Sequence, residues 1–156
     1  MDVKSLQNLV LTRLRANLVD VRTSDKRPDN RKWILSRFPD KDESENLDEF
    51  KSKFGYPLII VQTPSLTKAV MYSNGGMVGD YSMVIHVQHV GELALHDTLI
   101  KNIFDDFKLA LQENFYLSNG IYFDQIEFQP NDDDYLSQEK IYNSKLTIVF
   151  VEDEEN

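Results

Sequence analysis

The sequence predicts an α+β fold: a mainly antiparallel sheet of about five strands, with an N-terminal helix and one long helix packed on one face. Two segments with helical spacing and several β-branched or alternating segments support this prediction. The helical segments are 3–18 and 93–115, and the strand segments are 56–63, 66–72, 80–90, 121–128 and 140–151. We expect a single domain over residues 1–151, because 156 residues suffice for one core.

The N-terminal helix is predicted from Leu6, Val10 and Leu14, which recur every four residues between positions 3 and 18. Pro28 lies in the polar segment that follows, and proline cannot continue a helix because it lacks a backbone N–H. Residues 24–55 are therefore expected to form an inserted connection. Within it we expect an apolar cluster at 33–38 and a short helix at 47–54.

The central strands begin at residues 56–63, with Pro57 at the start of a strand or on an edge. Residues 66–72 are predicted to be the hairpin partner of that strand. The glycines and asparagine of 73–79 predict a hairpin tip, which leads into the strand 80–90. In that strand, Met83 and Val87 belong to the drier face, because alternate side chains point to opposite sides.

The C-terminal half contains the long predicted helix, a turn at 118–120 and two strands joined by a loop at 129–138. The apolar stripe of the helix contains Leu99, Ile100, Ile103, Phe104, Phe107, Leu111 and Phe115. In the last strand, Leu146, Ile148 and Phe150 share one face. Residues 152–156 (EDEEN) predict a solvated acidic tail.

Composition and charge exclude several classes of protein. The net charge is -9, made up of +5 over residues 1–41 and -14 over residues 42–156, and an acidic body repels nucleic-acid phosphates. The absence of cysteine excludes disulfides and thiolate chemistry and favours a reducing interior. The longest apolar run is 58–61, and the N-terminus lacks a signal peptide's apolar region, so we expect a soluble protein without a membrane partner.

The sequence offers only weak support for metal-binding or catalytic residues. His86 and His89 lie three apart on a predicted strand and so face opposite sides, which argues against a zinc site with His96 and Asp97. The acidic run at 131–134 could hold a hard cation, but it lacks the spacing of an EF-hand loop, and a solvated turn is favoured. Without a nucleophile motif, we expect no catalytic residue, metal or cofactor.

A basic and aromatic patch near residues 22–38 is the main candidate for binding a partner. Acidic residues interrupt it, so docking to a protein fits it better than reading DNA. The expected docking residues are Arg27, Arg31, Lys32, Trp33, Arg37 and Phe38. Arginine and tryptophan are enriched at interface hot spots. The alternative, that Trp33 and Phe38 fold back onto their own core, stays open.

The order of elements resembles the tail-terminator family of long-tailed viruses, also called tail-completion or head-to-tail joining proteins. The elements are the helix ending in Leu14-Arg15-Ala16-Asn17-Leu18, the hairpin, the strand Met83-Val84-Ile85-His86-Val87, the long helix and the closing strands. The resemblance covers residues 3–22 and 56–151 and is interrupted by the insertion at 24–55. It implies a non-enzymatic virion protein, assembled in the host cytoplasm, that forms a ring, usually a hexamer, at the head-proximal end of the tail tube.

The implied partners are further copies of the chain, the tail tube protein and a neck or head-completion protein. DNA is expected to pass through the ring without specific binding, which an acidic channel wall favours. The candidate channel-lining residues are Asp132, Asp133 and Asp134, with the tail residues 152–155 as a second choice. Two alternatives stay open: a soluble α+β ligand-binding or regulatory domain, and an enzyme without a recognised motif.

Overall fold

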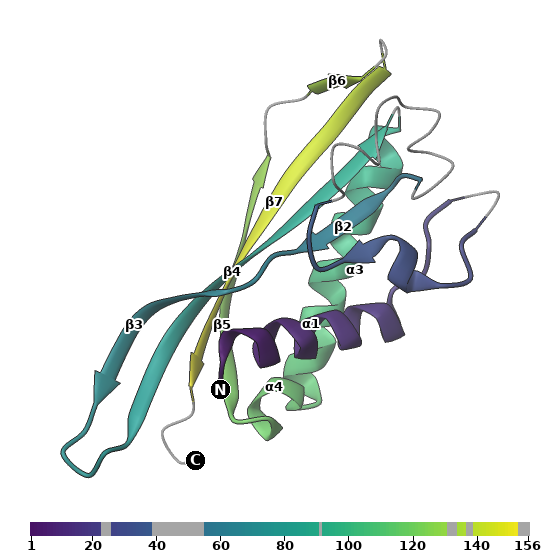
Figure 1. Cartoon of the computed structure of the whole chain (residues 1–156). Helices are drawn as coiled ribbons and strands as arrows, with labels where there is room; N and C mark the ends of the chain where they lie inside the picture. The colour runs from purple at the N-terminus through teal and green to yellow at the C-terminus, as the bar shows by residue number, and fades with distance from the viewer. Residues whose placement is uncertain (23–25, 39–54, 91, 131–133, 137–138, 153–156) are drawn as a thin grey trace.

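The computed structural model describes residues 1–22, 26–38, 55–90, 92–130, 134–136 and 139–152, and has the predicted α+β architecture (Figure 1). A mostly antiparallel sheet carries helices on one face. The elements are α1 (Val3–Asn17), η1 (Asn30–Lys32), β1 (Ile34–Leu35), β2 (Leu58–Val61), β3 (Ser65–Met71), β4 (Met77–Val90), α3 (Leu93–Gln112), α4 (Phe115–Ser118), β5 (Ile121–Pro130), β6 (Asp134–Leu136) and β7 (Glu139–Glu152).

The sheet is built around β4 and β7, two long antiparallel strands paired from Asp80 opposite Val151 to Val90 opposite Ile141. The main strand order is β1-β2-β4-β7-β5, while β3 pairs with β4 and β6 pairs with β7. Among the described strands, only β1 and β2 run parallel. The seven strands exceed the expected five because β1 and β6 are short strands within segments predicted to be connections.

The pairing of β2 with β3 as a hairpin was predicted wrongly. Both strands pair antiparallel with β4, from Leu58 opposite Gln88 to Met71 opposite Met77. The chain therefore runs along one side of β4 and is interrupted between β2 and β3 at Pro64, which has no N–H to donate to a ladder. The chain reverses direction at the glycine-containing tip that follows β3, as predicted, but the tip is shorter than 73–79 because β4 already begins at Met77.

The core lies between the sheet and the helices. Met83, Ile85 and Val87 of β4 are fully buried, which confirms the prediction for the drier face. The fully buried side chains that meet them are Leu146, Ile148 and Phe150 of β7 and Leu6, Val10 and Leu14 of α1. Each such side chain contributes about 1.5–3 kcal/mol to stability through the hydrophobic effect, so this layer fixes the orientation of the sheet relative to both long helices.

The long helix is shorter than predicted. It ends at Gln112, and Asn114 then adopts a left-handed backbone conformation (φ 55°) that starts the short helix α4. Leu111 was expected in the apolar stripe but is 52% exposed. Asp106 and Ala110 are buried instead. The Asp106 carboxylate accepts hydrogen bonds from Arg13 and Asn17 of α1, which compensate for its burial.

Glu152 was wrongly predicted to belong to a solvated acidic tail. Glu152 is the last residue of β7, and its carboxylate accepts hydrogen bonds from the Tyr81 hydroxyl and from the N-terminal amine of Met1 at 3.3 Å. The carboxylate is therefore part of the fold. Residues 153–156 lie outside the described residues. Within the described chain, no helix is both long and apolar enough to cross a membrane.

Candidate interaction surface

The basic segment contains one arginine that belongs to the interior. Arg27 pairs with Asp20 at 2.8 Å and donates further hydrogen bonds to the backbone carbonyls of Gly55 and Pro57. Burial alone would raise the pKa of Asp20, but the hydrogen bonds from Arg27 and Arg22 hold it below its usual value. Arg27 therefore holds the two ends of the inserted connection together and does not face a partner.

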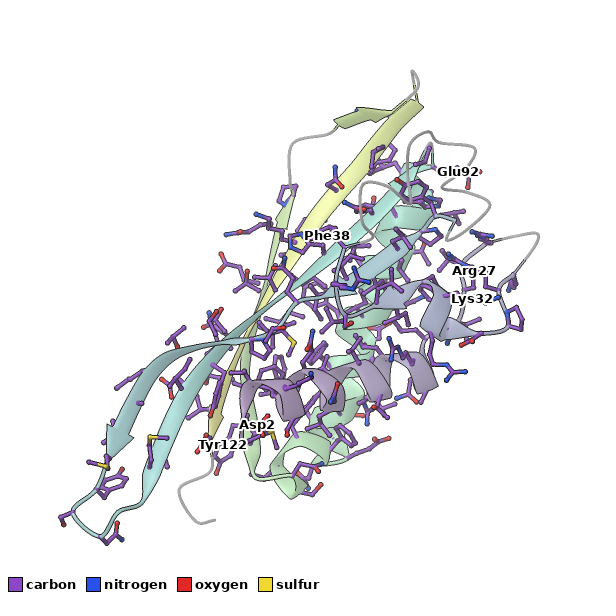
Figure 2. All side chains as sticks on the ribbon, viewed as in Figure 1. Asp2, Arg27, Lys32, Phe38, Glu92 and Tyr122 are labelled. Atoms are coloured by element: carbon purple, nitrogen blue, oxygen red, sulfur yellow. The ribbon has the colours of Figure 1, made fainter. Side chains whose placement is uncertain are left out.

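The two aromatic residues of the predicted docking set pack on their own chain. Trp33 is fully buried, its indole N–H donates to Asn30, and the Arg27 guanidinium lies 5.1 Å from its ring centroid. The Phe38 ring lies 4.8 Å from that of His86 on β4, over the sheet face opposite the helices (Figure 2). The alternative interpretation, packing onto their own core, therefore holds for Trp33 and in part for Phe38, which is still exposed.

The remaining basic residues, Arg31, Lys32 and Arg37, are exposed at the surface. Arg31 is 74% exposed at its side chain and pairs with Asp29 at 3.1 Å. Arg31 and Arg15 line a surface hollow of about 690 Å³ beside the C-terminal turn of α1. Burial, followed by the positive charge of Arg31, lowers the pKa of Arg15. Asp29 also lines this hollow and pairs with Arg31, so the hollow already holds a carboxylate of its own chain.

A second surface is formed by the β3–β4 hairpin, which projects past the helices (Figure 1). We call residues 68–79 the arm, because pairing of β4 with β7 begins only at Asp80. The arm is closed by a hydrogen bond from Tyr72 N–H to the Gly76 carbonyl at 2.7 Å. Gly75 has a φ of 87°, which favours glycine, and Asn74 accepts from the Gly76 N–H.

The arm carries the apolar face of the sheet beyond the helices. Odd-numbered residues of β4 face the helices up to Tyr81, whose hydroxyl reaches the Met1 carbonyl at the start of α1. Met77 continues this face, but it is 60% exposed, and its cross-strand neighbour Met71 is 77% exposed. Large apolar side chains in this arrangement are typical of a contact with another molecule.

An apolar hollow lies at the other edge of the sheet, between α3 and β5. It measures about 350 Å³ and is lined by Asp97, Ile100, Lys101, Phe104 and Phe128. Three of these side chains are apolar, and the two charged side chains are of opposite sign. We call it the α3–β5 hollow. Phe128 lies opposite Leu146 of β7, so it points to the helix side of the sheet, yet it is exposed.

The histidines do not come together with a third metal ligand. His89 and His96 are buried, and His96 Nε2 lies 2.9 Å from the Ser144 hydroxyl. Asp97 lines the α3–β5 hollow instead, and His86 faces the opposite side of the sheet. The described residues contain no group of three or more potential metal ligands among His, Asp and Glu. Burial lowers the pKa of His89 to about 4.

The predicted channel-lining residues are only partly placed. Asp132 and Asp133 lie outside the described residues, as do the tail residues 153–155. Asp134 begins β6, which pairs with the first residues of β7.

The methionines of the arm were missed by the sequence analysis. The signal was present, since Met77 and Tyr81 continue the alternation of the predicted strand toward its N-terminal end. No family model matches the chain, and no curated protein matches it.

Proposed function

We propose that the protein is a non-enzymatic structural protein of a long-tailed virus, of the tail-terminator type. Copies of the chain form a closed ring, a hexamer by the family resemblance, at the head-proximal end of the tail tube. The ring stops growth of the tube and joins it to a neck or head-completion protein.

The observation that carries this proposal is the arm. It exposes Met71 and Met77 at one edge of the sheet, and a different apolar surface, the α3–β5 hollow, lies at the other edge. Unlike surfaces on opposite edges favour a head-to-tail contact, which generates a ring when the rotation closes. A protein that joins to further copies of itself in this way acts through assembly and needs no catalytic group.

The basic surface supports contact with a second partner. Arg31, Lys32 and Arg37 are exposed on the segment that the resemblance does not cover, away from the arm. Arg31 already binds Asp29 through two hydrogen bonds, so an acidic rim on the tube or the neck would have to pair with Lys32 and Arg37 or displace Asp29.

The test adds the purified protein to tube protein that is polymerising and measures tube length and tube ends by electron microscopy. We expect shorter tubes than with tube protein alone, each with additional density at one end. Tubes of unchanged length that carry no bound protein would contradict the proposal.

A further inference from the structure

We propose that the arm of one copy lies along the β5 edge of the next copy, with Met71 and Met77 in the α3–β5 hollow and Lys68 beside Glu127. This contact rests on the proposed function, because it is the joint from which the ring is built. It names the contact surfaces, which the resemblance leaves open.

The apolar residues give the first argument. Met77 and Met71 form a cross-strand pair on the helix-side face of the arm, and among the described residues no helix covers that face. The α3–β5 hollow offers Ile100, Phe104 and Phe128 on the same side of its own sheet. When one sheet continues into the next, the two helix-side faces align, so the methionines meet the hollow. Methionine suits such a contact because its flexible side chain fills irregular spaces.

The sheet edges give the second argument. Among the described strands, β3 pairs only with β4 and β5 pairs only with β7, so each has one edge without a partner strand. These edges lie on opposite sides of the sheet. Backbone N–H and C=O groups along such edges recruit another strand, and strand addition is a common mode of protein association.

Charge gives the third argument and favours a second copy as the occupant. Residues 69–79 carry no charge, and Lys68 at the base of the arm lies opposite Asp80 of its own chain, so the arm is close to neutral, whereas β5 contains Asp124 and Glu127 and no basic residue. Lys68 and Glu127 both lie on the sheet face away from the helices, because their cross-strand neighbours Asp80 and Thr147 do. In a chain with a net charge of -9, the arm can therefore approach the acidic β5 edge of another copy without repulsion.

The test is site-directed disulfide crosslinking, in which only the introduced cysteines can react because the chain has no native cysteine. Met71→Cys protein is mixed with Phe128→Cys protein under oxidising conditions and analysed on a non-reducing gel. Met71 is chosen over Met77 because it lies on β3, the strand that would lie next to β5, whereas Met77 is one strand further away and beyond the reach of a disulfide. The control mixture uses Val70→Cys in place of Met71→Cys, because Val70 is its neighbour on β3 and is also exposed but lies on the opposite face of the arm. We expect a crosslinked dimer at least about fivefold more abundant than in the control mixture. Equal yields in the two mixtures would overturn the proposed contact.

A charge reversal tests the pairing of Lys68 with Glu127. Lys68→Glu and Glu127→Lys should each lower the crosslink yield by roughly threefold, and combining the two variants in one mixture should restore it. Failure of the combination to restore the yield would place the Lys68 contact elsewhere. Rings that form without the Met71–Phe128 crosslink would overturn this contact and leave the proposed function standing. A crosslink that forms although the protein does not cap tubes would support this contact and contradict the proposed function.

Discussion

At the scale of single residues, neighbouring basic side chains have separate roles. Arg27 and Arg31 lie four positions apart, yet Arg27 pairs with Asp20 in the interior, whereas Arg31 pairs with Asp29 in solvent. The sequence alone could not show which arginine is buried, because the path of the backbone decides which acidic residue lies next to each. The buried pair is expected to determine stability and the exposed one to affect only binding.

Arg27→Ala should destabilise the fold by about 3 kcal/mol, because it leaves the Asp20 carboxylate buried without its main partner. Arg31→Ala should change stability by less than about 0.5 kcal/mol, because its ion pair is exposed. Urea unfolding of the two variants measures the difference. Equal effects would mean that Arg27 is not part of the interior.

A second residue-scale prediction concerns acid. The pKa of His89 is lowered to about 4, chiefly by burial and then by the charges of His96, Arg22 and Arg27, with Asp20 opposing. The unfolded chain, with a pKa of 6.5, takes up the proton first as pH falls. Stability linked to His89 is therefore complete above pH 6.5, and about 2 kcal/mol of it is lost by pH 5.

The measurement is the free energy of unfolding at pH 8 and at pH 5. His89→Gln should remove most of the difference between the two, whatever its effect on stability at pH 8. His86→Gln is the matched control and should retain most of it, because His86 is only half-buried. A pH dependence unchanged in His89→Gln would contradict the assignment.

At the scale of elements, the sequence predicted the positions of the main strands and of the long helices, because each carries a clear period. It did not predict the strand pairing correctly. Pro64 between β2 and β3 favours a turn and so suggested a hairpin, but the two strands lie in line along β4. It missed β1, because two residues have no period, and the predicted helix at 47–54 lies outside the described residues. Trp33 was placed in a docking set because residue type does not reveal burial.

The arm gives the prediction at this scale. Replacing Met71 and Met77 together by serine should leave the monomer as stable as the wild type within about 0.5 kcal/mol, because both side chains are exposed. The same change should prevent self-association. The matched control replaces Val19 and Leu111, which are 66% and 52% exposed and lie outside the arm and the hollow. Sedimentation velocity distinguishes the two variants, and equal association of both would contradict a role for the arm.

At the scale of the whole molecule, the charge asymmetry bears on the channel of the proposed ring. Residues 42–156 carry -14, and we predict that part of this charge lines that channel, because like charge would lower its affinity for the phosphates of DNA that passes through it. The alternative is that these carboxylates lie on the outer surface and only keep the protein soluble. The electrostatic potential of an experimentally determined ring provides the measurement, and a strongly positive channel would count against the prediction.

The central claim is that copies of this chain close into a ring, and the most direct measurement is the mass of the particle in solution. Light scattering after size-exclusion chromatography gives that mass for the protein alone and with tube protein. The account predicts a single species of about six times 18.2 kDa for the protein alone or, where the ring forms only on the tube, loss of the 18.2 kDa species and its elution with the much larger tubes. A strictly monomeric species under both conditions would contradict it.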